Sequence, residues 1–213
     1  MKIGIDINGV LRDTIGKLTQ VYQKNFIDLY DEETVDPTYE LDMSGNTELS
    51  IQDNSFKYGM ELPVNSLNIP KHFKFKNEEE QFSFMYEDFA MEIFGHAGSS
   101  ETFTFNDLNN LYIDLRDKHE IVIISDEIGK SKPATLFFLS KFGCLAEKII
   151  FYNDFTKEEI LNSFDYLVTS NPNTIINYRN KMMVVKYETE YNENVEHLKT
   201  IKSISELKQI INA

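Results

Sequence analysis

The chain has 213 residues, 41% of them hydrophobic, which is enough for one substantial core and an inserted subdomain but not for two large domains. Its formal net charge of -14 repels phosphate backbones and anionic membranes, so we expect no nucleic-acid partner and no membrane partner. The single cysteine, Cys144, excludes an internal disulfide, and the sequence shows neither a signal peptide nor an apolar run of about 20 residues, so we expect a soluble cytoplasmic protein.

The chain starts with a strand pattern and a helix pattern. Residues 2–7 form a short β-branched run that ends at Asn8 and Gly9, two turn formers, which predicts a strand followed by a turn. Residues 13–30 carry apolar side chains at three- and four-residue spacing, which predicts an amphipathic helix packed on one face.

A long irregular region follows the first helix. Residues 31–76 are rich in Asn, Asp, Ser, Gly and Pro, but their scattered aromatic side chains predict that the region folds against another part of the molecule. Helical spacing returns after three glutamates at positions 78–80, which suit a helix N-terminus. The apolar stripe of this helix consists of Phe82, Met85, Phe89 and Phe94. We interpret the stripe as the interior of the insertion, and an exposed stripe would instead indicate a docking face for another protein.

The second half alternates short apolar runs with helical patterns, which is typical of parallel strands joined by helical crossovers. The predicted strands are residues 120–125, 148–152, 166–169 and 182–186, and the predicted helices are residues 107–118, 131–142, 157–164, 172–178 and 205–211. Together with residues 2–7, this order predicts an α/β fold with a Rossmann-like parallel sheet covered on both faces. A long insertion follows its first strand.

The loop after the first strand carries the most informative motif, because ligands of such sheets bind beyond the carboxyl ends of the strands. Residues 3–11 read IGIDINGVL. They resemble the first motif of the haloacid dehalogenase superfamily, which has an apolar strand, an Asp, any residue, a second Asp, a small residue and Val-Leu. The resemblance implies that Asp6 is a nucleophile that attacks phosphorus, and that Asn8 stands at the position of the general acid/base.

Three later segments extend the resemblance. Ser125 ends an apolar run and matches the hydroxyl residue that holds a phosphoryl oxygen, and Lys132, followed by Pro133, matches the lysine that offsets the phosphate charge. The fourth motif of the family ends a strand with acids that bind magnesium. In this chain Thr169 and Ser170 stand at those positions. Asp6 is then the one acid of the family's metal site that remains, so we expect weak magnesium binding.

These departures predict poor catalysis. The amide of Asn8 has no proton to give to a leaving group, and loss of general acid–base catalysis costs a factor of roughly 100 to 10,000. We therefore expect a non-catalytic protein without a cofactor, retained as a binding or structural component. The alternative is an active Mg-dependent phosphohydrolase, similar to a nucleotidase, that forms a phosphoaspartyl intermediate on Asp6. It would recruit metal with the help of Asp126, Glu127 or Asp154 from neighbouring loops.

The resemblance divides the chain. Residues 1–12 and 118–213 correspond to the core, and residues 13–117 correspond to the cap inserted in relatives, including deoxyribonucleotidase-like members. The first and last helices of this insertion are also candidates for packing on the core. We expect protein partners to bind through residues 31–117. The Asn-, Lys- and Ile-rich composition and the N-terminal segment resemble proteins of tailed phages, which implies a protein of the host cytoplasm or of the phage particle.

Each candidate residue also has an ordinary structural interpretation. Asp6 is able to cap the turn by accepting from the amides of Gly9 and Val10, and Ser125 is able to end a strand without binding a ligand. Lys132 is by default a solvated lysine. The four histidines lack the spacing of metal ligands, which argues against a zinc site.

Overall fold

The computed structural model describes residues 1–27 and 56–211. Six parallel strands form one sheet in the order β3-β2-β1-β4-β5-β6. The strands are β1 (Lys2–Asp6), β2 (Glu120–Ser125), β3 (Lys148–Phe151), β4 (Tyr166–Thr169), β5 (Met183–Tyr187) and β6 (Thr200–Ile201). The predicted α/β class with a Rossmann-like parallel sheet is therefore confirmed.

The sixth strand was not predicted from the sequence. β6 has only two residues, so it has no apolar run that a pattern search would find. It forms because its backbone pairs with the end of β5, with Tyr187 opposite Ile201. The other strands were predicted to within one residue at each end, because each contains a short run of mainly apolar side chains between turn or helix patterns.

β1 lies in the middle of the sheet between β2 and β4. From β1 the chain builds the sheet outward through β2 and β3, and then crosses to the other side of β1 to build β4, β5 and β6. The strand order therefore changes direction beside β1. The carboxyl ends of β1, β2 and β4 meet at this switch point, where parallel α/β sheets bind their ligands.

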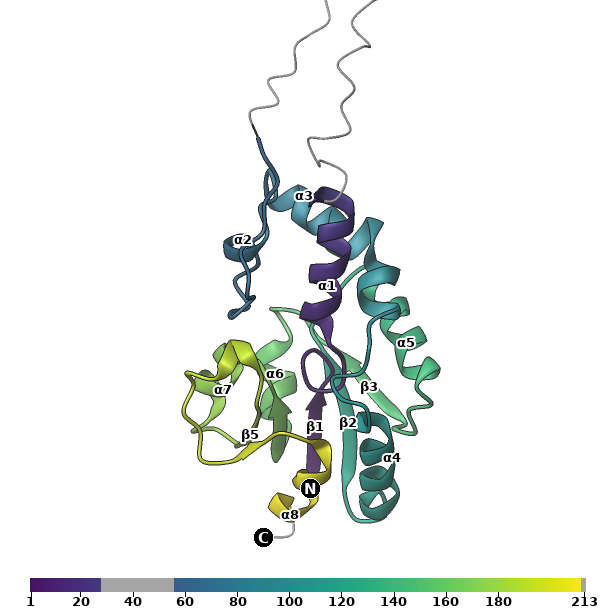
Figure 1. Cartoon of the computed structure of the whole chain (residues 1–213). Helices are drawn as coiled ribbons and strands as arrows, with labels where there is room; N and C mark the ends of the chain where they lie inside the picture. The colour runs from purple at the N-terminus through teal and green to yellow at the C-terminus, as the bar shows by residue number, and fades with distance from the viewer. Residues whose placement is uncertain (28–55, 212–213) are drawn as a thin grey trace, which may run out of the picture.

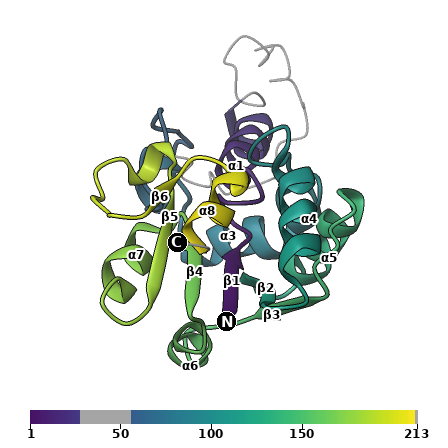
Figure 2. The ribbon, with the colours of Figure 1, turned by 90° about the horizontal axis from the view of Figure 1, so that it is seen from below.

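Helices cover both faces of the sheet. One face packs against α4 (Thr104–Leu115) and α8 (Leu207–Ile211), and the other packs against α6 (Lys157–Asn162) and α7 (Pro172–Tyr178). Figure 2 shows α4 and α5 (Ser131–Lys141) toward one end of the molecule and α7 toward the other. Among the described residues, no helix combines the length and the apolar composition that a membrane crossing needs.

The described part of the insertion has its own aromatic core. It contains α1 (Thr14–Tyr22) with its π-helical continuation η1 (Gln23–Ile27), then α2 (Ile69–His72), α3 (Glu78–Ser83), and the π-helical turns η5 (Phe84–Asp88) and η6 (Met91–Gly95). Figure 1 shows α1 and α3 beyond the carboxyl end of β1. Tyr22 lies at the centre of this core and donates to the carbonyls of Gly59 and Lys74 at 3.1 and 2.6 Å. Residues 28–30 of the predicted first helix and residues 31–55 of the predicted irregular region lie outside the described residues.

The aromatic stripe after the three glutamates is interior, apart from its first member. Met85 and Phe94 are buried and Phe89 is partly buried, whereas Phe82 is 43% exposed. The single predicted helix is in fact divided into α3, η5 and η6. The π-helical turns widen the spacing locally, which the regular three- and four-residue pattern did not predict.

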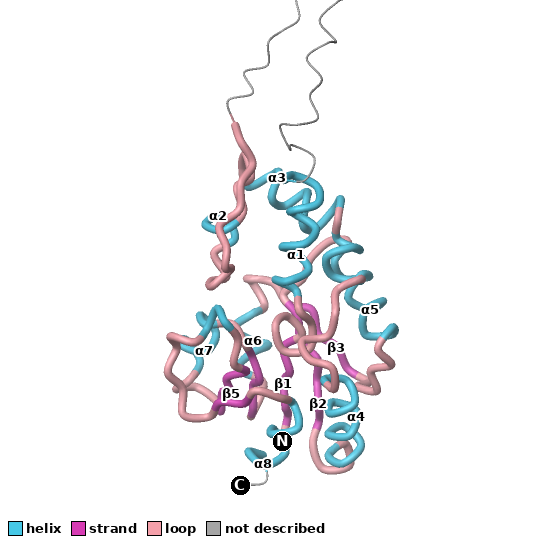
Figure 3. The backbone as a smooth tube through the Cα atoms, in the orientation of Figure 1, coloured by secondary structure: helices cyan, strands magenta, loops and turns pink. Residues whose placement is uncertain are grey.

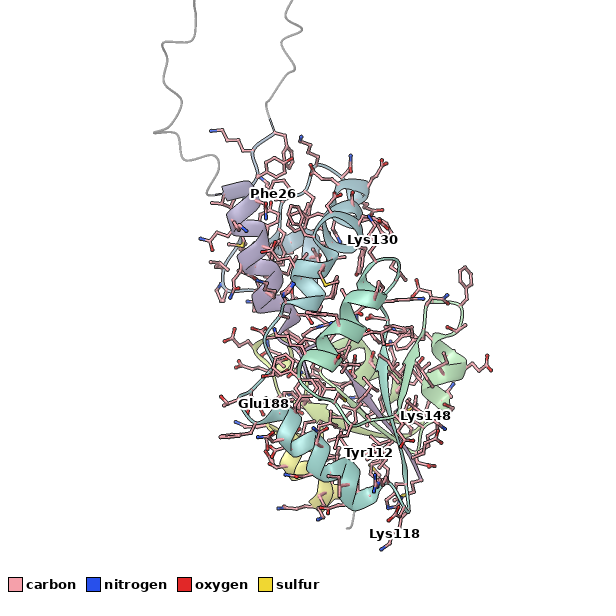
Figure 4. The ribbon with its side chains drawn as sticks, turned by 90° about the vertical axis from the view of Figure 1, so that its right-hand side faces the viewer. Phe26, Tyr112, Lys118, Lys130, Lys148 and Glu188 are labelled. Carbon is pink, nitrogen blue, oxygen red and sulfur yellow. The ribbon has the colours of Figure 1, made fainter. Side chains whose placement is uncertain are left out.

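Helix α5 joins the insertion to the sheet. Its Ala134 belongs to the core of the insertion, and its Phe138 belongs to the core beneath the sheet. Just before α5, Lys130 pairs with Glu87 of the insertion at 2.9 Å, and Figure 4 shows Lys130 at the end of α5 that faces the insertion. The contact between η6 and α5 is close at Gly95, where a Cβ would lie 3.3 Å from Cδ1 of Phe137 and 2.5 Å from Sδ of Met91.

Candidate functional site

Asp6 is the last residue of β1 and is buried at the switch point. One carboxylate oxygen accepts from the backbone N–H of Asn8 at 3.3 Å, and the other accepts from the hydroxyl of Thr169 at 2.9 Å. The strand ends here because the following loop turns back on itself: the N–H groups of Leu11 and Arg12 both donate to the carbonyl of Ile7. Figure 3 shows this loop curling above β1.

Gly9 makes the loop possible. Its φ of +74° lies in the left-handed region, which side chains other than glycine rarely adopt. A Cβ at this position would also lie 1.8 Å from the hydroxyl oxygen of Tyr191 and 2.4 Å from that of Ser170. The loop after β1 is therefore in tight contact with the loops after β4 and β5.

The surroundings of Asp6 disfavour its charged form. Burial raises the pKa of Asp6 to about 7, and the negative charge of Asp126 contributes in the same direction. The hydrogen bonds from Thr169 and Asn8 oppose this rise in pKa, as does the positive charge of Arg12. At neutral pH a substantial fraction of the Asp6 carboxyl groups is therefore protonated, and a protonated carboxyl is a poor nucleophile.

Asn8 bridges three groups. Its side-chain oxygen accepts from Arg12 Nη2 at 2.6 Å and from the hydroxyl of Thr14 at 2.7 Å. Its side-chain nitrogen donates to Asp126 Oδ1 at 3.3 Å. The side-chain amide therefore acts both as an acceptor, for two donors, and as a donor, to a carboxylate.

A buried ion pair lies behind Asn8, and it involves Arg12, a residue with no role predicted from the sequence. Arg12 is fully buried and pairs with Glu127, which is 1% exposed and follows β2. Glu127 also accepts from the hydroxyl of Thr135. Burial lowers the pKa of Arg12 to about 9, so it remains a cation at neutral pH. The available signal was an arginine directly after the apolar Val10 and Leu11, in a segment expected to be buried.

Three loop acids were candidates for recruiting a metal ion, and the structure places them in different surroundings. Asp126 is exposed and reaches the edge of the site through Asn8. Glu127 is buried and accepts hydrogen bonds from Arg12 and Thr135 through its two carboxylate oxygens. Asp154 is exposed on the loop after β3.

Ser125 and Lys132, the residues expected to bind phosphate, lie on the β2 side of Asp6. Ser125 is fully buried at the end of β2, and its hydroxyl has no hydrogen-bond partner among the described residues. A buried hydroxyl without a partner costs about 1–3 kcal/mol and is available to an oxygen ligand. Lys132 is exposed in the first turn of α5, and its Nζ lies 5.6 Å from the centre of the Phe151 ring.

Neutral hydroxyl and amide groups close the β4 side. Ser170 is buried next to Thr169, and its hydroxyl lies 2.9 Å from the carbonyl oxygen of Asn8 and 2.8 Å from the hydroxyl of Tyr191. Asn192, in the 3₁₀ turn η7 (Glu190–Asn192), donates to the carbonyls of Ser170 and Tyr187, each at 2.8 Å. Burial raises the pKa of Tyr191 to about 12, so this phenol stays neutral.

This donor set does not fit the magnesium ion that the resemblance implies. Magnesium prefers hard anionic oxygens at short, near-octahedral distances, and usually binds one or two carboxylates together with waters and substrate phosphate. Here an Asp6 oxygen accepts from Thr169, and the Asn8 carbonyl has the hydroxyl of Ser170 within hydrogen-bonding distance. Within residues 1–27 and 56–211, no group of three or more His, Cys, Asp or Glu side chains is arranged to hold a metal.

An acidic cleft of about 550 Å³ lies beside the site, between the start of α1, residues 62–64 of the insertion and the loop after β5. Its carboxylates belong to Asp13, Glu101, Glu188 and Glu190, and none of the described residues that line it is Lys, Arg or His. A second cavity, of about 600 Å³, lies at the opposite end of the strands beside Lys118 and Lys148, which Figure 4 labels. It is remote from the switch point.

Comparisons with known proteins support the fold alone. The sequence matches no known family profile and no curated protein. Among solved structures, the chain is similar to a "putative haloacid dehalogenase-like hydrolase" from Burkholderia xenovorans LB400. The two share 13% sequence identity with a TM-score of 0.53, over 98% of this chain and 95% of that one. The chain therefore has the fold of a haloacid dehalogenase-like hydrolase.

Proposed function

We propose that this chain is a binding or structural protein that retains the haloacid dehalogenase-like fold without efficient phosphatase turnover. The observation that carries this proposal is the arrangement at the end of β4. There the hydroxyl of Thr169 donates to Asp6 and that of Ser170 lies within hydrogen-bonding distance of the Asn8 carbonyl, where the family resemblance implies metal-binding acids. Without the metal, several kcal/mol of transition-state charge stabilisation are missing.

The charge around the site supports the same proposal. The cleft beside the site is lined by carboxylates, and the whole chain has a formal net charge of -14. This field lowers the local concentration of phosphate esters. The raised pKa of Asp6 further reduces the fraction of carboxylate that is able to attack phosphorus at neutral pH.

The proposed partner is another protein, bound through residues 31–117 and, in the phage setting, within the particle. The described part of this region exposes large apolar side chains singly, among them Leu62, Phe82, Met91 and Phe103. Phe and Met side chains are enriched at the cores of protein interfaces relative to the rest of the surface. Residues 31–55 lie outside the described residues.

A second candidate function is an active phosphohydrolase of the nucleotidase type. It is favoured by the buried hydroxyl of Ser125, which has no partner among the described residues and lies on the strand next to Asp6. Asp126 would supply a second carboxylate at the edge of the site. Asp6 would attack phosphorus, and Ser125 and Lys132 would hold the phosphoryl oxygens.

A hydrolysis assay separates the two functions. We expect the wild-type protein to release no phosphate from p-nitrophenyl phosphate or from a nucleoside monophosphate, with or without millimolar Mg²⁺. The matched variants are Asp6→Ala and, as a control, Asp117→Ala, which removes an exposed acid at the opposite end of the sheet, before β2. Hydrolysis that Asp6→Ala abolishes and Asp117→Ala preserves would establish the phosphohydrolase.

Magnesium binding gives an independent test. A ligand that binds only the native state raises its stability, so a bound cation would raise the thermal unfolding midpoint. We expect no heat of binding at millimolar Mg²⁺ and no change in the midpoint. A clear rise that disappears in Asp6→Asn would contradict the non-catalytic proposal.

A further inference from the structure

We infer that the guanidinium of Arg12 is the resident cation of this site, and that the same contacts fasten the insertion to the sheet. This role of Arg12 is independent of whether the protein hydrolyses phosphate. Its charge balances the carboxylates of Asp6, Asp126 and Glu127 at the carboxyl ends of β1 and β2, where the donor set does not fit a metal ion.

Each N–H group of the Arg12 side chain donates a hydrogen bond. Its Nε donates to the hydroxyl of Thr14 at 3.2 Å, and its Nη1 donates to the hydroxyl of Thr135 at 2.7 Å and the carbonyl of Phe94 at 2.9 Å. Its Nη2 donates to Asn8 at 2.6 Å and to Glu127. All five N–H groups of the side chain therefore have acceptors. A guanidinium with this many aligned acceptors is held in one orientation.

The charge of Arg12 acts on the carboxylates of the site. Glu127 is in direct contact with it, and both Asp6 and Asp126 attract it strongly enough to oppose the fall in its pKa that burial causes. Asn8 lies between Arg12 and Asp126 and hydrogen-bonds both. Arg12 thus supplies, from within the protein, positive charge of the kind that a bound cation would bring.

The same side chain links segments that are distant in the sequence. Its acceptors come from the loop after β1, the start of α1, η6 of the insertion, the loop after β2 and helix α5. The guanidinium carbon also lies 5.0 Å from the ring centre of Phe94 and 5.2 Å from that of Phe138, close enough for cation–π attraction. Movement of η6 away from the sheet would therefore break contacts of the charged group.

Chemical rescue distinguishes a resident cation from a side chain that only fills space. Arg12→Ala removes the atoms that correspond to ethylguanidinium and leaves room for that ion beside Glu127. Because the ion would bind the native state alone, it should raise the thermal unfolding midpoint of Arg12→Ala by several degrees at about 50 mM. Ethylurea has a similar shape without the charge and should give no rise.

The control is Arg179→Ala, which removes an exposed arginine at the end of α7. Like the wild type, it should show no rise in midpoint with ethylguanidinium. Equal effects of ethylguanidinium and ethylurea on Arg12→Ala, or no effect of either, would overturn the inference. If Arg12→Ala is recovered unfolded, the same two compounds are added during refolding, and only ethylguanidinium should restore the folded fraction.

The link to the insertion has its own measurement. Arg12→Lys keeps the charge but loses most of the fork of donors, so the amides of residues 91–95 should exchange with solvent faster than in the wild type, by about tenfold or more. Amides in β3, which Arg12 does not contact, should keep their wild-type exchange rates. Unchanged exchange of residues 91–95 would show that Arg12 does not hold the insertion.

Discussion

The two sides of the site handle polar groups in opposite ways. On the β1–β2 side, charged groups are buried and paired, with Arg12 against Glu127. On the β4–β5 side, the groups that contact Asp6 and Asn8 are the neutral hydroxyls of Thr169 and Ser170, backed by Tyr191 and Asn192, while the buried Lys186 donates instead to the carbonyl of Val195. Asp6 lies between the two sides and contacts the neutral one directly.

This difference shows two ways in which polar groups are accommodated at one edge of the sheet. In the buried ion pair, the two opposite charges neutralise each other and all N–H donors have acceptors. The neutral donors on the opposite side carry no charge, so they need no counter-ion. Asp6 is left in a largely desolvated position, which explains its raised pKa. The contrast predicts that adding charge to the neutral side, or unbalancing the charged side, has much larger effects than removing one neutral group.

The largest effect should follow from adding acids to the neutral side. The triple variant Asn8→Asp, Thr169→Asp, Ser170→Asp supplies both the general acid and the metal ligands, so it should gain a Mg²⁺-dependent thermal shift and hydrolyse p-nitrophenyl phosphate. Asn8→Asp alone should restore neither metal binding nor turnover. The double variant Thr169→Asp, Ser170→Asp should restore metal binding without turnover. Because these residues act as a unit, the triple should exceed the sum of the partial variants by a factor of roughly 100 or more.

A nucleoside monophosphate should be tested beside p-nitrophenyl phosphate, whose good leaving group masks the need for an acid. The control is Asp6→Ala in the triple background, which should abolish turnover. Strictly additive rates would contradict the assignment of Thr169 and Ser170 to the metal positions.

The next effect unbalances the charged side. Glu127→Ala leaves Arg12 as a buried cation without its carboxylate, which should lower the free energy of unfolding by about 3–5 kcal/mol. Glu158→Ala is the matched control, because its pair with Lys181 is exposed on both sides and should contribute less than about 1 kcal/mol. Urea unfolding at pH 7 measures both. Equal losses in the two variants would show that the buried pair has no special weight.

The pH dependence of stability tests the position of Asp6 between the two sides. A carboxyl group whose folded pKa is raised to about 7 is penalised when it ionises, so the wild type should lose stability relative to Asp6→Asn as the pH rises from about 4 to about 7. This relative loss should be at most about 4 kcal/mol and level off above pH 7. The other carboxyl groups contribute equally to both proteins, so they cancel in the difference. A difference that stays constant over this pH range would show that the carboxyl is not perturbed.

The smallest effect removes one neutral donor. Thr169→Val preserves the shape of the side chain but removes the hydrogen bond to Asp6, which should raise the pKa of Asp6 further. The variant also removes the acceptor of the Asn171 N–H at every pH, so the cost should be larger by about 1–2 kcal/mol at pH 8, where Asp6 is charged, than at pH 5. Thr200→Val is the control, because its hydroxyl donates to the carbonyl of His197 and should show no such pH dependence. Equal costs at both pH values would exclude a direct effect on Asp6.

The sequence predicted the sheet well because its strands are encoded locally. The run before Asp6 and the run that ends at Ser125 are β-branched and continuous, and both proved to be central strands with their ends side by side. The boundaries within the insertion were less predictable. Apolar spacing gave the existence of a helix after the three glutamates, but π-helical turns depend on how aromatic side chains pack, which the spacing does not encode.

The sequence by itself determined the fold class, the place of Asp6 at a strand end, and the hydroxyl residues Thr169 and Ser170 at the end of β4, since each depends on a short segment of the chain. Only the tertiary structure decided which charged side chains form ion pairs. Arg12 and Glu127 are 115 positions apart, and their pairing depends on the loop geometry around Gly9, on the parallel register of β1 with β2, and on the close approach of η6 to α5. Burial makes that pairing necessary, because a guanidinium removed from water must find acceptors for all of its donors.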